Sequence, residues 1–310
     1  MGTPEFACAI LEKLIDSDHE IVAVVTGADK PAGRRRVLTP TAVRNLAEQR
    51  GLPVLMPKSL KEDSLYQSLA ALQADLFVVA AFRILPARLF ELPRLGSINI
   101  HASLLPKYRG AAPINWAIIN GETETGLTSF FLKQNVDTGD MILQTKVTIA
   151  PTDTYDSLHD RLADLAGPFT LETLSMIEKG KSHPIAQDDA VATPAPKIQP
   201  EDALIDFNQS SVRVANFIRG MATRPGAYTF FRGQKVKVHF AQSSDHISDS
   251  AAVPGSILSN RKTLLVQCHD SVAELTRVVP AGRKEMDGVS FLNGFRPQTG
   301  ESFINQGKAE

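Results

Sequence analysis

The chain has 310 residues, 43% of them apolar and 22% charged, which is an ordinary globular composition and a length that fits two domains better than one. Its formal net charge of −1 excludes nucleic-acid binding through bulk charge, so any RNA contact must come from local basic patches. No apolar run approaches the roughly 20 residues of a membrane span, and the first residues lack the pattern of a secretion signal.

The two cysteines, Cys8 and Cys268, are far apart in the sequence. They have neither CxxC spacing nor the cysteine and histidine spacing of a zinc site. We therefore expect no disulfide framework and no metal, which suits a reducing cytosol, either of bacterial type or within an organelle.

The first residues form a loop that leads into a helix without a strand before it. Residues 2–4, Gly-Thr-Pro, form the loop, and apolar residues at helical spacing follow from Phe6 to Ile15. A doubly wound sheet normally begins with a strand that feeds its first loop and helix, and no residues supply it here. We expect the gene product to start further upstream, and the strand edges at 21–26 and 76–81 to be poorly paired.

A basic loop follows the first strand that the sequence does predict. The β-branched run at 21–26 is typical of a strand buried on both faces, and a Pro-Ala-Gly sequence at 31–33 then leads into three arginines. The basic residues of the loop are Lys30, Arg34, Arg35 and Arg36. A short basic run is usually a solvated loop, but arginines also pair with phosphates and stack on unpaired bases.

Helical and strand patterns alternate along the next part of the chain and predict an α/β fold. We expect helices at 40–51, at 60–72 with Ser59 as its cap, and at 113–120. We expect strands at 55–56, 76–81 and 97–100, followed by antiparallel additions at 127–132 and 141–149.

Polar residues follow two of these strands. Asn99 and His101 are two positions apart, so a strand at 97–100 directs both to one face at its C-terminal end, where open α/β sheets bind ligands. Asp137 follows the strand at 127–132. Each residue by itself is more often structural, but an amide, an imidazole and a carboxylate can meet at this sheet edge.

The second half of the chain has a different pattern. A helix is expected at 155–179, with Gly167-Pro168 as a point where it kinks or divides, and a polar, Pro/Ala-rich linker follows. A helix at 212–221 then precedes short strands at 227–231, 236–241, 255–258, 264–267 and 273–279, which suggest a small barrel. We predict a catalytic domain at 1–182, a linker at 183–200 and a second domain at 201–310.

The stretch from Asn99 to Asp140 resembles the formyltransferases that use 10-formyltetrahydrofolate, whose active site contains Asn-x-His, Ser-Leu-Leu-Pro and a later Asp-Thr-Gly-Asp. The resemblance extends from Gly2 to about Gly294. It implies a Rossmann-like formyltransferase domain with a C-terminal OB-like β-barrel domain, and a one-carbon transferase that needs no metal. It implies catalytic roles for Asn99, His101 and Asp137.

The resemblance also implies where the two substrates bind. The folate co-substrate is expected at Ser103, Leu104, Leu105, Pro106, Ile84 and Leu85. The chain departs from the family next to this site, since the family commonly has a glycine after the aromatic residue where this chain has Phe82-Arg83 and is one residue shorter. The family's basic loop enters a tRNA acceptor stem, which implies tRNA contacts by Lys30, Arg34, Arg35 and Arg36.

Several acceptors of the formyl group remain open. The basic loop and the Pro-Ala-Gly-Arg-Lys sequence at 280–284 favour the α-amine of methionyl initiator tRNA, in translation initiation by a monomeric enzyme. The alternatives are a sugar nucleotide, glycinamide ribonucleotide, or a non-catalytic RNA-binding role. In the favoured reaction Asn99 would stabilise the oxyanion, His101 would move protons, and Asp137 would either orient His101 or accept the amine proton through water.

Overall fold

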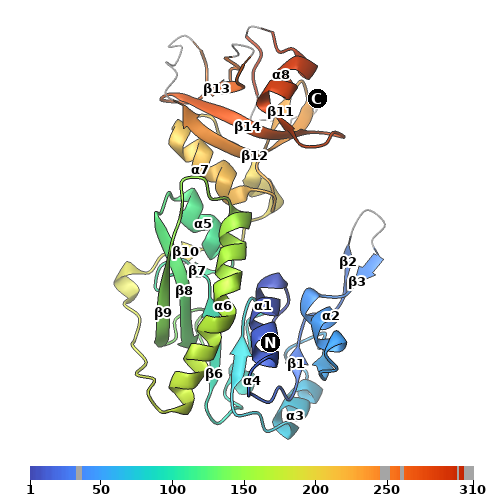
Figure 1. The fold of residues 1–310 in the computed structure, drawn as a ribbon, viewed down its shortest axis with the longest axis vertical. Coiled ribbons are helices and arrows are strands. Elements are labelled where there is room, and N and C mark those ends of the chain that lie inside the picture. Colours follow the sequence, from blue (N-terminus) through green and yellow to red (C-terminus); the bar gives the residue numbers. More distant parts are fainter. Residues whose placement is uncertain (33–36, 245–251, 259–261, 299, 304–310) are drawn as a thin grey trace. The chain divides into compact units, whose positions relative to one another are not determined.

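The computed structural model describes residues 1–32, 37–244, 252–258, 262–298 and 300–303. The chain divides into two compact units, whose elements are labelled in Figure 1. The first unit contains Met1–Pro113, Thr125–Thr148 and His159–Pro196, and the second contains Ile114–Glu124, Ile149–Leu158 and the residues from Lys197 onward. The division at 196 falls inside the segment 183–200 that the sequence marks as a linker, and the three domain boundaries stay a prediction.

A mixed sheet in the first unit positions the candidate site. β5 (Phe77–Val79) pairs in parallel with β6 (Ser97–His101), and β6 pairs antiparallel with β8 (Glu124–Phe131). β9 (Met141–Thr148) completes the order β5-β6-β8-β9. The strands expected near 97–100, 127–132 and 141–149 are confirmed, and so is the antiparallel direction of β8 against β6.

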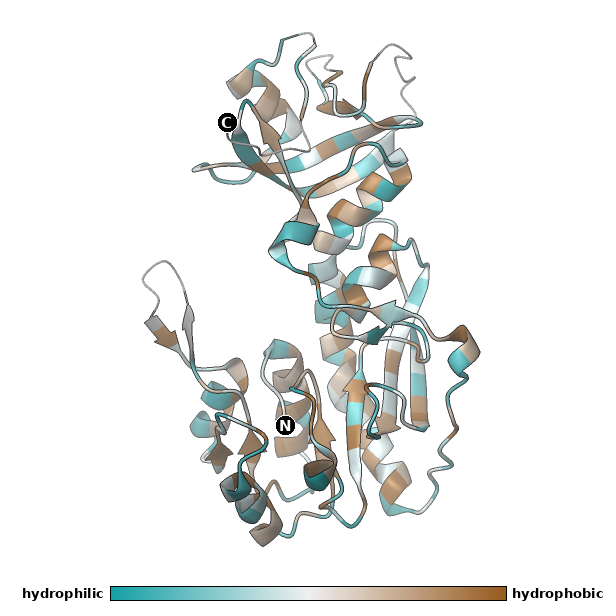
Figure 2. Cartoon of the chain, turned by 180° about the vertical axis from the view of Figure 1, so that it is seen from behind, coloured by the Kyte–Doolittle hydropathy of each residue, from teal (hydrophilic) through white to brown (hydrophobic). Residues whose placement is uncertain are grey.

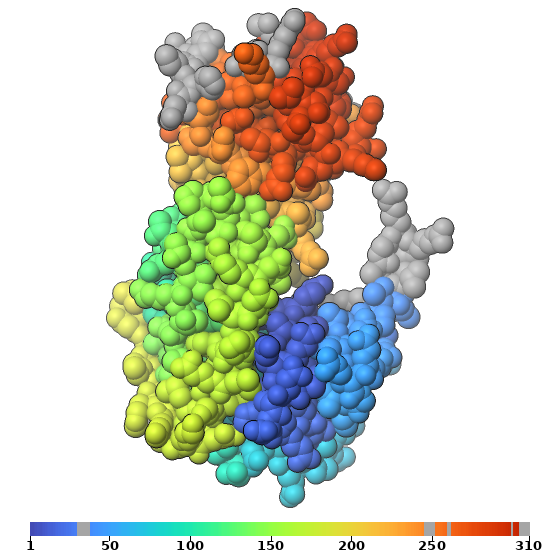
Figure 3. Space-filling view, viewed as in Figure 1, coloured from blue at the N-terminus to red at the C-terminus, as the bar shows by residue number. Residues whose placement is uncertain are grey.

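The part of the chain described up to residue 178 contains six helices: α1 (Glu5–Ile15), α2 (Ala42–Gln49), α3 (Asp63–Ala71), α4 (Ala87–Phe90), α5 (Pro113–Ile119) and α6 (Tyr155–Glu178). All of α5 except its first residue, and the start of α6, belong to the second unit. Figure 3 shows the atoms of α1 between those of α2 and α6. Gly167 allows α6 to approach α1 closely, because a Cβ built on it would lie 2.3 Å from Cγ of Lys13. Of the two outcomes expected at Gly167-Pro168, division of α6 is wrong, since the helix continues through both residues, and a kink stays a prediction.

The expected start of the third helix is also wrong. α3 begins at Asp63 rather than at residue 60, so Ser59 does not cap it. The Ser59 N–H instead donates a hydrogen bond of 2.8 Å to the Glu62 carboxylate, which closes a turn before the helix. This short-range bond satisfies a backbone donor outside the helix, and the sequence pattern did not reveal it.

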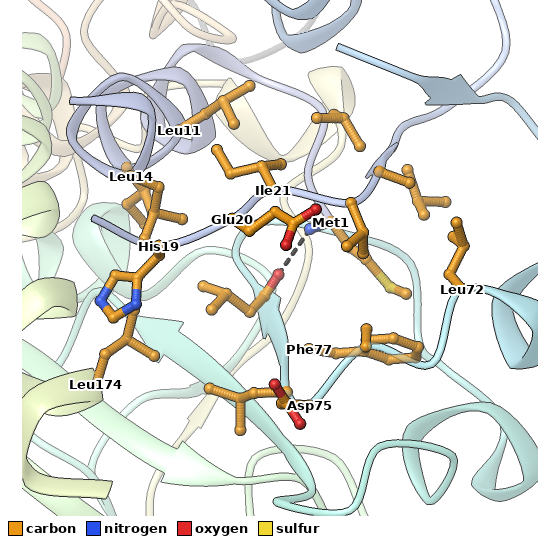
Figure 4. Close-up of a pocket in the computed structure, with 18 of the residues that line it drawn as sticks. Met1, Leu11, Leu14, His19, Glu20, Ile21, Leu72, Asp75, Phe77 and Leu174 are labelled. Carbon is orange, nitrogen blue, oxygen red and sulfur yellow. Dashed lines mark hydrogen bonds between the residues drawn. The ribbon is translucent and has the colours of Figure 1, made fainter. Parts of the chain in front are cut away.

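A cavity of about 620 Å³ lies between β1 (Val24–Val25) and β5, which belong to separate sheets (Figure 4). β1 pairs in parallel with β4 (Val54–Leu55) on its other edge. Among the described residues, Met1 and Gly2 supply the backbone hydrogen bonds between β1 and the strand that contains β5: the Gly2 N–H donates to the Val25 carbonyl, and the Met1 carbonyl accepts from the Ala80 N–H, both at 3.0 Å. The poorly paired edges expected at 21–26 and 76–81 are therefore confirmed, and β1 is shorter than expected.

Apolar side chains line most of this cavity. They come from α1, from the segment before β1, and from the region of α3 and β5, and they include Leu11, Leu14, Ile21, Leu72 and Phe77. Figure 4 also shows the Met1 nitrogen, which donates a hydrogen bond of 2.6 Å to the Val78 carbonyl. The cavity is thus a feature of the sheet core and is lined by none of the residues expected to act in catalysis.

Two short paired strands flank the basic segment in the sequence. β2 (Lys30–Ala32) pairs antiparallel with β3 (Val37–Thr39). Just before β2, Asp29 pairs with Arg44 of α2 at 2.6 Å, and their side chains are 27% and 24% exposed. The expected tRNA residues Arg34, Arg35 and Arg36 lie outside the described residues, and Lys30 is described as backbone in β2.

The second unit contains a curled antiparallel sheet. Its strand order is β11 (Tyr228–Phe231), β12 (Gln234–Ser244), β14 (Val272–Pro280) and β13 (Leu265–Gln267), with β15 (Met286–Asp287) on β14. Register shifts around Phe240 bend β12 against β14. Figure 2 shows hydrophobic and hydrophilic bands alternating along the long strands, as expected for strands with one buried face.

The part of this unit that follows residue 200 is the C-terminal OB-like domain that the resemblance implies. α7 (Ser211–Met221) and α8 (Gly288–Phe295) pack with the sheet, and the core is rich in phenylalanine rings: Phe207, Phe231, Phe291 and Phe303. The prediction of a strand at 255–258 is wrong. Ser256 and Ile257 form only isolated bridges, to Ser302 and Val266, so the segment does not continue the sheet.

Candidate active site

β6 presents an amide and an imidazole near its C-terminal end. Asn99 and His101 are two residues apart on this strand, so their side chains leave the same face of the sheet. The ring of Phe130 on β8 meets the His101 ring edge-on, with 6.5 Å between centroids. Only 6% of the His101 side chain is exposed, so the imidazole is held in a largely dry environment.

Hydrogen bonding fixes the protonation pattern of the neutral His101 ring. Its Nε2 atom lies 2.9 Å from the backbone carbonyl oxygen of Tyr108. A carbonyl oxygen only accepts hydrogen bonds, so Nε2 must carry the hydrogen. The Nδ1 atom of the neutral ring is then a free acceptor, and it is this atom that faces Asp137. His101 can therefore take up a proton at Nδ1 without losing its bond to Tyr108.

Asp137 reaches the site from the loop between β8 and β9. Its Oδ2 atom accepts a hydrogen bond of 2.9 Å from the Gly110 N–H and lies 3.7 Å from Nδ1 of His101. The backbone of Asp137 has φ 54°, a left-handed conformation that non-glycine residues rarely adopt and that gathers at functional sites. The structure thus brings His101 and Asp137 together, with Asn99 on the same strand as His101.

Two glycines allow the backbone to approach closely on both sides of this site. Gly110 has φ 126°, and a Cβ there would lie 2.5 Å from the Ala195 carbonyl oxygen. A Cβ on Gly139 would lie 1.5 Å from the Phe131 carbonyl oxygen. Any larger residue at either position would therefore displace a loop that carries part of the site.

The residues expected to bind folate differ in exposure. Ser103 is fully buried, and its hydroxyl donates to the Lys107 carbonyl at 2.7 Å. Leu105 is also buried, and its N–H donates to the Thr128 hydroxyl at 3.1 Å. Ser103 and Leu105 therefore shape the turn after β6, while Leu104 and Pro106 are partly exposed.

The second expected folate segment follows β5. Ile84 is 72% exposed, whereas Leu85 packs in the core with Val79 and Leu89. The shortened loop at Phe82-Arg83 is anchored by Arg83, whose guanidinium donates to the Pro57 and Lys58 carbonyls. Ile84 is thus the member of the apolar pair that is available to a ligand.

Several residues at the candidate site were not predicted from the sequence. The guanidinium of Arg109 donates to the Gln187 side-chain oxygen and pairs with Asp189 at 2.7 Å. Farther along, β7 (Arg109–Gly110) pairs in parallel with β10 (Pro194–Ala195). The segment read as a linker therefore forms part of the site, and its polar composition gave no signal of that pairing.

Neither thiol is poised for reaction. Burial is the largest cause that raises the pKa of Cys8 to about 11 and that of Cys268 to about 12, so both remain protonated near neutral pH. Within the ranges that the structure describes, no three histidine, cysteine, aspartate or glutamate side chains are grouped as metal ligands. No helix in those ranges combines the length and the apolar character needed to cross a bilayer.

Comparison with known families matches both parts of the chain. Residues 1–174 match the family model described as "Formyl transferase", and residues 197–296 match "Formyl transferase, C-terminal domain". The chain is 41% identical over 312 residues to a protein of Geobacter sulfurreducens named methionyl-tRNA formyltransferase, an alignment that covers 100% of this chain and 97% of that protein. A protein of the same name from Trichlorobacter lovleyi is 43% identical over 95% of this chain and 92% of its own length.

Solved structures share the fold at lower identity. A sugar 3N-formyl transferase, crystallised with dTDP and 5-N-formyl-THF, aligns with a TM-score of 0.68 and 16% identity over 91% of this chain and 97% of its own. Methionyl-tRNA formyltransferase from Clostridium thermocellum aligns with a TM-score of 0.50 and 16% identity, over 66% of this chain and 88% of its own. At these identities the likeness speaks for the fold alone.

Proposed function

The chain belongs to the formyl transferase family, and from this premise we propose that it transfers a formyl group from 10-formyltetrahydrofolate to the α-amino group of methionyl initiator tRNA. The observation that carries the proposal is the likeness of 41% over the full chain to a relative named for that activity. The sugar formyl transferase, by contrast, is similar at 16% identity. The chain therefore functions in translation initiation.

The site supports this reaction through three groups. The amine attacks the formyl carbon, a C–N bond forms, and the carbonyl electrons move onto oxygen to give a tetrahedral oxyanion. The amide of Asn99 is the proposed donor to that oxyanion, a role in which the loss of one hydrogen bond typically costs about 10²–10³ in rate. The bond from the carbon to N10 then breaks, and N10 takes up a proton as it leaves.

His101 and Asp137 are the proposed proton-handling pair. The attacking nitrogen must lose a proton, and Nδ1 of His101 is the unprotonated ring atom because Nε2 donates to Tyr108. A proton taken up at Nδ1 is placed 3.7 Å from the Asp137 carboxylate, whose negative charge stabilises the imidazolium. The same proton is then available to the leaving N10, so the two transfers balance without a covalent enzyme intermediate.

The binding partners follow from the same premise. We propose that the folate lies against Ile84, Leu104 and Pro106, while the buried residues Leu85, Ser103 and Leu105 shape the two segments that carry them. We also propose that Lys30, Arg34, Arg35 and Arg36 contact tRNA. Arginine side chains can pair with phosphates and stack on the unpaired bases of an acceptor end. We further propose that the protein acts as a monomer in a bacterial-type cytoplasm, where its tRNA substrate is charged.

Formyl transfer from 10-formyltetrahydrofolate to a panel of acceptors tests the proposal. The panel contains charged initiator tRNA, charged elongator tRNA, a dTDP-amino sugar and glycinamide ribonucleotide, each at several concentrations. We expect kcat/KM to be highest for methionyl initiator tRNA and far lower for the two small acceptors. A higher kcat/KM for the amino sugar or for glycinamide ribonucleotide would overturn the proposed acceptor but leave formyl transfer in place.

A further inference from the structure

The side chain of Gln187 joins the two loops that form the candidate site. Its amide nitrogen donates to the backbone carbonyls of Asp137 at 2.9 Å and of Gly139 at 2.8 Å. Its amide oxygen accepts from Nε and Nη2 of Arg109 at 3.0 and 2.8 Å. One half-buried amide therefore links the loop after β8 to the loop after β6.

The orientation of this amide is determined by its partners. Arginine has only donors, so the atom of Gln187 that faces Arg109 must be the oxygen. Backbone carbonyls have only acceptors, so the atom that faces Asp137 and Gly139 must be the nitrogen. No other side chain of the same length supplies an acceptor to one loop and two donors to the other, which makes the amide chemistry of Gln187 specific.

Arg109, to which Gln187 binds, is itself held by several hydrogen bonds. The Arg109 guanidinium pairs with Asp189 at 2.7 Å, and only 16% of the Arg109 side chain is exposed. The Arg109 backbone N–H donates to the Thr193 carbonyl, and the Tyr108 N–H donates to the Thr193 hydroxyl, both at 2.9 Å. Tyr108 is also the residue whose carbonyl orients His101.

The two carbonyls held by Gln187 belong to the part of the chain that places the carboxylate. Asp137 has φ 54°, and a backbone in this region persists only where its surroundings enforce it. The Asp137 side chain makes one hydrogen bond across the site, to the Gly110 N–H, and lies 3.7 Å from His101. The bonds from Gln187 to the carbonyls of Asp137 and Gly139 therefore hold the loop backbone at the site.

We infer that Gln187 is a positioning residue that holds the Asp137 carboxylate against His101 and the Gly110 N–H. The inference rests on the proposed function for its effect on turnover, and on the geometry of the first unit for its effect on the loop. Gln187 does not touch the reacting atoms. It acts through Asp137, whose misplacement by about 1 Å is enough to cost roughly 10²-fold in rate.

Two substitutions separate the bonds that Gln187 makes. Gln187→Glu keeps the length and the acceptor for Arg109, but it replaces the donor amide with a carboxylate oxygen that repels the carbonyls of Asp137 and Gly139. Gln187→Met keeps the length and removes both sets of bonds. Gln67→Glu on the exposed face of α3 makes the same change in charge away from the site and is the matched control.

We expect both Gln187 variants to lower kcat for methionyl initiator tRNA by at least about tenfold and to change the pH profile of kcat. Their affinity for 5-formyltetrahydrofolate and their thermal midpoint should remain close to those of the unmodified protein, and Gln67→Glu should match it in every respect. Unchanged kcat and an unchanged pH profile in both variants would overturn the inference.

Hydrogen exchange of the Gly110 amide provides a readout that does not depend on the reaction. If Gln187 holds Asp137 in place, both variants expose the Gly110 N–H and accelerate its exchange, while the amides of β6 and β8 keep their protection. Equal acceleration throughout β6 and β8 would show a general structural role and overturn the inference. Faster Gly110 exchange in a protein that does not formylate tRNA would overturn the proposed function and leave the positioning role supported.

Discussion

The Nδ1 atom of His101 lies 3.7 Å from the Oδ2 atom of Asp137, and the other ring nitrogen of His101 is occupied by the Tyr108 carbonyl. The carboxylate therefore faces the one ring nitrogen that is free to accept a proton. This relationship addresses a choice that the sequence left open, since it places Asp137 where it stabilises a protonated His101. The position of the carboxylate depends on the backbone of its loop, whose carbonyls at Asp137 and Gly139 accept hydrogen bonds from Gln187.

Replacement of Asn99 tests the oxyanion role. We expect Asn99→Ala to lower kcat for formyl transfer by at least about 10²-fold, because a donor to the oxyanion acts on the transition state. Affinity for 5-formyltetrahydrofolate should change little. Asn45→Ala, on the exposed side of α2, is the matched control and should leave kcat unchanged. Near-normal turnover in Asn99→Ala would remove Asn99 from the mechanism.

Replacement of Asp137 by asparagine removes the negative charge of the side chain but keeps its size. In Asp137→Asn the side-chain oxygen can still accept the Gly110 N–H, so the loop should keep its conformation while the negative charge beside His101 is lost. We expect kcat to fall by about 10²-fold and its pH profile to shift, with little change in the thermal midpoint. Asp164→Asn, exposed on α6, removes a charge elsewhere and serves as control. An unaltered pH profile would contradict a role for the carboxylate in proton transfer.

The basic segment between β2 and β3 in the sequence is expected to bind tRNA through its positive charge. Replacing Arg34, Arg35 and Arg36 by alanine should raise KM for tRNA. The slope of log affinity for tRNA against log salt concentration should become shallower by roughly 0.7–0.9 for each tRNA phosphate that is no longer neutralised. Folate affinity should be untouched, because the expected folate residues lie on other loops. KM values that match those of the unmodified protein at low and high salt would identify the segment as a solvated loop.

The second unit contains an ion pair whose contribution to stability depends on pH. The forked bonds from Arg232, together with the Gln298 N–H, lower the pKa of Glu301 from 4.5 to about 2. Because the folded pKa is the lower one, the stabilisation is present above pH 4.5 and is lost as pH falls towards 2. Glu301→Gln should therefore lower the free energy of unfolding at neutral pH. Between pH 4.5 and 2 the variant should lose less unfolding free energy than the unmodified protein. Unfolding curves with the same acid dependence in both proteins would contradict the assignment.

Local patterns predicted much of the framework of the site. Buried β-branched runs and strand alternation placed β6 and β8, and the spacing of Asn99 and His101 followed from that strand. The connection to Asp137 was an inference from strand order, and the structure supplies the distance. Patterns of this kind work because they depend on neighbours within a few residues.

Long-range pairing explains what the sequence did not predict. β10 is a short strand in a polar, proline-rich segment, and it exists because Arg109 and Gly110 offer their backbone to it. The role of Gln187 depends on partners that are equally distant in the sequence. The strand expected at 21–26 is shorter in the structure, where β1 covers Val24–Val25. In the described part of the chain, the remaining apolar residues of this run lack a neighbouring strand to pair with. Composition contains no information about either partner.

The most direct test of the account is the single-turnover transfer of labelled formyl from 10-formyltetrahydrofolate to methionyl initiator tRNA, measured with the unmodified protein and with His101→Ala. We predict formyl-methionyl-tRNA as the product of the unmodified protein, and a rate lower by at least about 10²-fold for His101→Ala with folate binding retained. The account would be contradicted by an unmodified protein that leaves the methionine amine unformylated, or by a His101→Ala variant that transfers the label at the unmodified rate.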